Sequence, residues 1–68
     1  MKRYIIEQFT SRNTSFNRDI YAVNRLSAKS KAKKISLGVH FPVTIHADDN
    51  SYVKFDQGIL VEHSILPF

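Results

Sequence analysis

The stretch NRLSAKSKAKKISLG, residues 24–38, decides the fold because it has the periodicity of a helix, while the segments around it alternate like strands. Ala28, Ala32 and Ile35 recur in it at the spacing that aligns one narrow apolar face of a helix. Asn24 is suited to cap the first turn, and Gly38 to follow the last one. We therefore expect one helix over about residues 25–37, whose small alanines let it lie close to a sheet.

The segments on both sides of this helix have the composition and two-residue alternation of β-strands. The expected strands cover residues 3–9, 16–23, 39–47, 52–55 and 59–66. The polar loop SRNTS separates the first two and predicts a hairpin, and the turns DDNS and DQG separate the last three. Pro42 cannot donate a hydrogen bond to a neighbouring strand, so we expect its strand to lie at a sheet edge or to begin near this residue.

The order of elements is therefore ββαβββ, which predicts an α+β fold. Its simplest closure is a single antiparallel sheet of four to five strands with one helix packed on a face. A chain of 68 residues is expected to be one small domain, residues 1–68. A domain of this size buries only about 60% of its unfolded surface. It has no cysteine, so neither a disulfide nor a thiolate zinc site can stabilise it.

The helical stretch also holds five basic residues and no acid, although the net charge of the whole chain is only +4. Arg25, Lys29 and Lys33 recur every four residues and form one ridge, and Lys31 and Lys34 flank it. Like charges at this spacing cost about 0.2–0.5 kcal/mol per pair when nothing relieves them. This surface is either a solvated helix face or a binding face for nucleic-acid phosphates or an acidic protein surface.

No pattern of catalytic or metal-binding residues is present, so we expect no enzyme activity, no catalytic residue, no metal and no cofactor. His40 and His46 share a strand face but lie roughly 20 Å apart at about 3.3 Å per residue, too far to share a zinc ion. The turn DDNS lacks the spacing of a calcium loop. There is no glycine-rich phosphate loop, no cysteine nucleophile and no G-x-S-x-G motif.

The start of the chain, MKRYIIEQFT, is not expected to form a secretory signal, because its apolar run stops at Glu7. No stretch of the sequence approaches the length of a membrane-spanning helix. We therefore expect a soluble cytoplasmic protein that does not associate with a membrane.

In its layout the chain resembles small phage-encoded anti-CRISPR proteins that act on type I systems. Their opening strand reads Y-[IL]-I, an A-V pair and a later A-K pair mark the entry into the helix, and a hairpin surrounds an acidic turn that contains asparagine. The matching positions are Tyr4-Ile5-Ile6, Ala22-Val23, Ala28-Lys29 and Asp48-Asp49-Asn50. The resemblance spans most of the chain, and its motifs are short.

This resemblance implies a non-catalytic inhibitor of phage or mobile-element origin in the cytoplasm of a host bacterial cell. Such a protein binds a subunit of the crRNA-guided surveillance complex (Cascade) and blocks target-DNA binding or nuclease recruitment. Some members expose basic residues that also touch DNA. Others are acidic DNA mimics, and because this chain is basic we do not expect DNA mimicry.

The binding residues predicted for the partner or for nucleic acid are Arg25, Lys29, Lys31, Lys33 and Lys34. Tyr21, Tyr52 and Phe68 are candidate aromatic anchors of a protein interface. A small basic nucleic-acid-binding protein is the alternative, and a structural or regulatory phage protein is a third hypothesis. The sequence leaves open whether the chain is a monomer or a homodimer.

Overall fold

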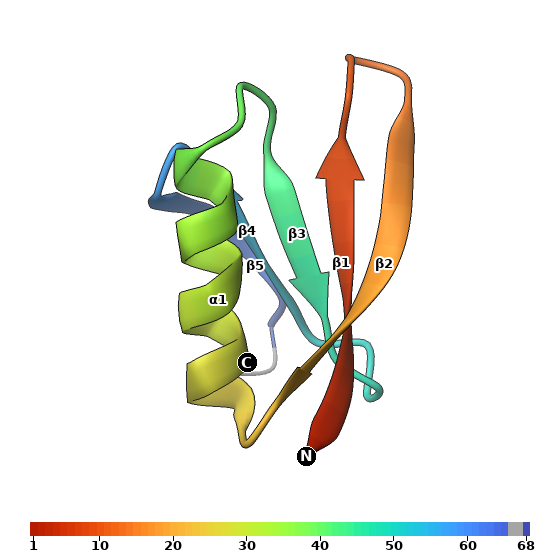
Figure 1. Cartoon of the computed structure of the whole chain (residues 1–68), viewed down its shortest axis with the longest axis vertical. Coiled ribbons are helices and arrows are strands. Elements are labelled where there is room, and N and C mark those ends of the chain that lie inside the picture. The colour runs from red at the N-terminus through yellow and green to blue at the C-terminus, as the bar shows by residue number, and fades with distance from the viewer. Residues whose placement is uncertain (66–67) are drawn as a thin grey trace.

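The computed structural model describes residues 1–65 and residue 68, and this part of the chain forms one antiparallel sheet of five strands with one helix across a face (Figure 1). The strands are β1 (Lys2–Phe9), β2 (Ser15–Ala22), β3 (Val43–His46), β4 (Tyr52–Asp56) and β5 (Ile59–His63), and the helix is α1 (Arg25–Leu37). The predicted fold class and the order ββαβββ are confirmed.

The order of strands across the sheet is β2-β1-β3-β4-β5, so β3 is the central strand. It begins immediately after Pro42, so of the two alternatives expected for this strand the start near Pro42 is observed and the edge position is not. The proline needs no edge because it precedes the ladder instead of interrupting it. The last strand ends at His63, earlier than expected, and the final residue of the predicted strand, Leu66, lies outside the described residues.

Both ends of α1 are capped, as Asn24 and Gly38 predict. The Asn24 side chain accepts a hydrogen bond from the Ser27 backbone N–H at 2.8 Å. At the other end the Gly38 backbone N–H donates to the Ile35 carbonyl at 3.1 Å. These contacts satisfy backbone groups that the ends of a helix otherwise leave unpaired.

The core lies between α1 and the facing side of the sheet. Its buried apolar side chains are Tyr4, Ile6, Ala22, Ala28, Ala32, Val43, Ile45, Val53 and Phe55. Ala28 and Ala32 are completely buried, and their small size lets the helix backbone approach the sheet closely. Ile35, the third residue of the predicted stripe, is only half-buried, whereas its neighbour Ser36 is completely buried.

Ser36 joins the end of the helix to the turn between β4 and β5. Its hydroxyl donates to the Lys33 carbonyl at 2.7 Å and accepts from the Gly58 backbone N–H at 2.9 Å. Gln57 and Gly58 both have positive φ, 50° and 84°, as a two-residue type I′ hairpin turn requires. A Cβ atom at Gly58 would lie 2.5 Å from Leu37 Cδ2, so the glycine also permits this close approach. The β4–β5 hairpin is thereby held beside α1.

Candidate binding surface

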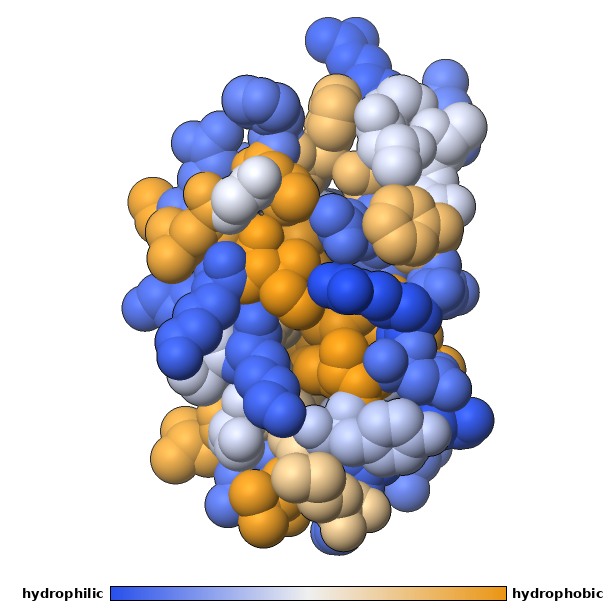
Figure 2. Space-filling model, in the orientation of Figure 1, coloured by the Kyte–Doolittle hydropathy of each residue, from blue (hydrophilic) through white to orange (hydrophobic). Residues whose placement is uncertain are grey.

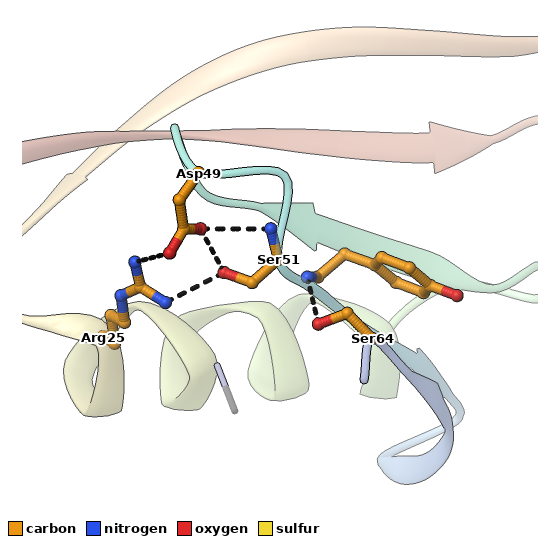
Figure 3. A network of polar contacts seen from close by, with 5 residues as sticks. Arg25, Asp49, Ser51 and Ser64 are labelled. Atoms are coloured by element: carbon orange, nitrogen blue, oxygen red, sulfur yellow. Dashed lines mark hydrogen bonds and ion pairs between the residues drawn. The ribbon is translucent and has the colours of Figure 1, made fainter. Parts of the chain in front are cut away.

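The five predicted binding residues do not form one continuous row. Arg25 turns toward the loop between β3 and β4, where it forms an ion pair with Asp49 at 2.6 Å and donates to the Ser51 hydroxyl at 2.9 Å (Figure 3). On the other side of the helix, the Lys31 ammonium donates to the Tyr21 carbonyl at 2.6 Å. The predicted solvent-facing ridge is therefore wrong at Arg25, which is half-buried and makes internal contacts.

Asp49 is the centre of the polar network in Figure 3. One of its carboxylate oxygens accepts from both the backbone N–H and the hydroxyl of Ser51, and the other accepts from Arg25. The hydrogen bond from the Ser51 hydroxyl and then the one from Arg25 hold the pKa of Asp49 well below its usual range. The same carboxylate raises the pKa of Arg25. The network joins the first turn of α1 to the β3–β4 loop.

This network predicts a loss of stability in acid. Because the pKa of Asp49 is lower in the folded state, its contribution is complete above the pKa of an unfolded aspartate, about 3.9, and is lost as the pH falls further. We expect the urea midpoint of the parent to fall more steeply between about pH 5 and pH 2.5 than that of Asp49→Asn. The matched control is Asp48→Asn, which should keep the parent's slope. Parallel curves for the parent and Asp49→Asn would contradict the prediction.

Three lysines of α1 remain available for a partner. The side-chain ammonium groups of Lys29, Lys33 and Lys34 have no hydrogen bond or ion pair with residues 1–65 or with Phe68. Lys33 and Lys34 are exposed, and Lys29 is half-buried. The positive charge available to a partner is therefore smaller than the sequence predicts, and it is concentrated on one part of the helix.

Two of these lysines line a groove between α1 and β5. Its lining residues are Leu26, Lys29, Ser30 and Lys33 from the helix with Phe55, Gly58 and Leu60 from the β4–β5 hairpin, and its volume is about 380 Å³. We call it the α1–β5 groove. The helix packs over β2, β3 and β4 and does not cover β5, so every residue of β5 is exposed. The groove lies between the helix and this uncovered strand.

Large apolar side chains around the α1–β5 groove are exposed. Leu26 is 76% exposed, Leu37 is 64% exposed and Leu60 is 39% exposed. On the α1 side of the molecule, at the left of the view, Figure 2 shows hydrophilic side chains between hydrophobic ones. The sequence analysis missed these leucines because none belongs to the stripe of Ala28, Ala32 and Ile35. Leu26 and Leu37 lie on a different face of the helix from this stripe. Two leucines away from the predicted core face were the signal in the sequence that could have revealed an exposed apolar surface.

The opposite face of the sheet carries several polar side chains that contact one another. His46 Nε2 lies 3.2 Å from Glu7 Oε1, and the Tyr52 hydroxyl donates to Glu62 at 2.6 Å. Glu62 raises the pKa of Tyr52 through this hydrogen bond. Strand alternation places Glu7, Asp19, Asp56 and Glu62 on this face, which are four of the six acids in the chain. The same alternation places Arg3 and Lys54 on this face, and Arg3 lies 3.8 Å from Asp19, so the face carries charges of both signs.

The candidate aromatic anchors have different environments. Tyr21 is 54% exposed and is open to a partner. Tyr52 is half-buried and bound to Glu62. Phe68 packs inside the structure, with its ring centroid 5.9 Å from that of Tyr4 and 5.7 Å from the Arg25 guanidinium carbon. Two of the three predicted anchors therefore make internal contacts, and the exposed leucines of the α1–β5 groove are better placed.

Comparison of the chain with protein-family models, with curated proteins and with solved structures found no match. Within residues 1–65 and 68, no group of three or more histidines, cysteines or acids is arranged to hold a metal ion. The helix of this described part is neither long nor apolar enough to cross a membrane.

Proposed function

We propose that this protein is a non-catalytic inhibitor of phage or mobile-element origin. It binds a subunit of a type I crRNA-guided surveillance complex in the host cytoplasm and blocks target-DNA binding or nuclease recruitment. The observation that carries the proposal is the surface formed by α1 and β5, where lysines without internal partners lie beside large exposed apolar side chains.

The mixture of these residue types favours a protein partner over nucleic acid. A duplex is bound mainly through phosphates, and only three of the five helical cations lack an internal contact that would compete for them. Exposed leucines gain little against a phosphate backbone. Protein interfaces, in contrast, have an apolar centre with a polar rim. In the α1–β5 groove, Leu60 is an apolar lining residue and Lys33 a charged one.

In this proposal the identity of the partner comes from the resemblance to type I anti-CRISPR proteins. The matching positions lie in β1, at the passage from β2 into α1, within α1 and in the β3–β4 loop. In that loop Asn50 has a positive φ of 69°, a conformation that asparagine tolerates better than most residues. The resemblance at these positions supports a scaffold like that of the anti-CRISPR proteins. The α1–β5 groove supports binding to a protein.

The test is complex formation with a purified type I surveillance complex. We expect the protein to co-elute with the complex at physiological salt and to remain bound after nuclease treatment. Inhibition of target-DNA binding or nuclease recruitment should saturate near the number of binding sites, because the inhibitor acts by occupancy. Inhibition at strongly substoichiometric amounts, sensitivity to a chelator, or no complex with the surveillance complex would contradict the proposal.

The alternative is a small basic nucleic-acid-binding protein, which the unpartnered Lys29, Lys33 and Lys34 favour. Such a protein would bind duplex DNA without any protein partner. Its association with the surveillance complex would also disappear after nuclease treatment. The nuclease arm of the same experiment therefore separates the two functions.

A further inference from the structure

We infer that the α1–β5 groove binds a segment of a protein partner that carries carboxylates beside large apolar side chains. The inference rests on the proposed function in one respect, that the chain acts by binding protein. It does not depend on which protein is bound.

The charge of the α1–β5 groove argues for carboxylates. Lys29 and Lys33 are one helical turn apart on the same rim, and like charges at this spacing repel each other. No acid lines the groove. A carboxylate bound between the two ammonium groups relieves the repulsion and accepts charge-assisted hydrogen bonds.

The shape of the α1–β5 groove argues for apolar anchors between those carboxylates. Phe55 and Leu60 provide an apolar wall from the hairpin, while Leu26 and Leu37 stand near the two ends of the helix. At 1.5 Å rise per residue these two leucines are about 16 Å apart along the helix axis, which suits a short segment and not a large surface. Large apolar side chains of such a segment would cover the exposed parts of Leu26 and Leu60.

A second copy of the chain fits the α1–β5 groove poorly. Two copies that met through this surface would bring Lys29 and Lys33 of one close to the same residues of the other. The β5 edge also carries an irregularity, because its pairing with β4 shifts between Lys54 and Phe55, and such bulges hinder edge-to-edge pairing. The charges therefore favour an acidic partner over self-association.

The experiment is an NMR titration of the isotopically labelled full chain with three short synthetic peptides. In the first peptide glutamate and leucine alternate, in the second lysine replaces glutamate, and in the third serine replaces leucine. We expect only the first to shift the amide signals of Leu26, Lys29, Lys33 and Leu60 in a saturable way. Shifts on the opposite sheet face instead, equal binding of all three peptides, or no binding of the first would overturn the inference.

Two groove variants and one control sharpen the titration. Lys29→Glu combined with Lys33→Glu should weaken the first peptide by about tenfold or more, since two attractive pairs become repulsive. Leu60→Ser should weaken it as well, without a change of charge. The control combines Lys2→Glu with Arg12→Glu, which changes the net charge equally on exposed residues outside the groove. The spectra of the free variants report whether each one is folded, and equal peptide affinity in all variants would overturn the inference.

The same variants tested with the surveillance complex separate this inference from the proposed function. Loss of complex formation in the groove variants but not in the control supports both. A complex that forms equally well with the groove variants leaves the proposed function in place and overturns the groove as its site. Peptide binding without any complex overturns the proposed function and leaves the inference in place. Duplex DNA that shifts the groove residues when no peptide does would assign the lysines to nucleic acid and overturn the inference.

Discussion

Replacement of Ala32 by aspartate is expected to unfold the protein in water. Ala32 is completely buried where α1 meets the sheet, and a carboxylate placed there would have no charged partner. Burying an unpaired charge costs several kcal/mol, and a domain of this length has a total stability of only about 3–10 kcal/mol. Circular dichroism and the dispersion of amide signals would report the loss of structure.

The matched control is Lys34→Asp, which introduces the same side chain on the exposed side of the same helix. It should stay folded and lose at most about 1 kcal/mol, because a negative charge near the C-terminal end of a helix is unfavourable. The same substitution at half-buried Ile35 should have an intermediate effect. If Ala32→Asp kept the parent's spectrum, α1 would have to pack through another face.

Reversal of the three available lysines is expected to weaken non-specific binding to duplex DNA strongly. The variant Lys29→Glu, Lys33→Glu, Lys34→Glu changes the net charge from +4 to −2, since each reversal removes two units. None of these side chains belongs to the buried core, so the fold should remain intact. Fluorescence anisotropy with a labelled duplex at low salt would measure the loss.

The salt dependence of the parent tests the same assignment quantitatively. With three phosphate contacts, affinity should fall by about 40-fold when salt rises from about 50 to about 200 mM, and the variant should show almost no dependence. The control with Lys2→Glu, Arg12→Glu and Arg18→Glu has the same net charge and should bind more like the parent. A steeper slope in the parent would mean that Arg25 or Lys31 leaves its internal contact on DNA. Equal binding of the parent and the first variant would show that these lysines form only a solvated helix face.

Local features of the sequence determined the elements and most of their bounds. The helix spans Arg25–Leu37, as the apolar stripe and the two flanking residues, Asn24 and Gly38, predict. The strands follow from alternation, and the hairpin between β1 and β2 follows from the polar loop. These features are readable because periodicity, capping and turn preferences act between residues that are close in the chain.

The pairing of the strands and the identity of the available charges were decided only by the tertiary structure. Alternation tells which residues share a face but not which strands are neighbours, so the central position of β3 could not be read from Pro42. The contact of Arg25 with Asp49 joins residues far apart in the chain, and it removes one charge from the predicted ridge. The α1–β5 groove has the same origin. It depends on which strands the helix covers, and a single helix is too narrow to bury all five strands of the sheet.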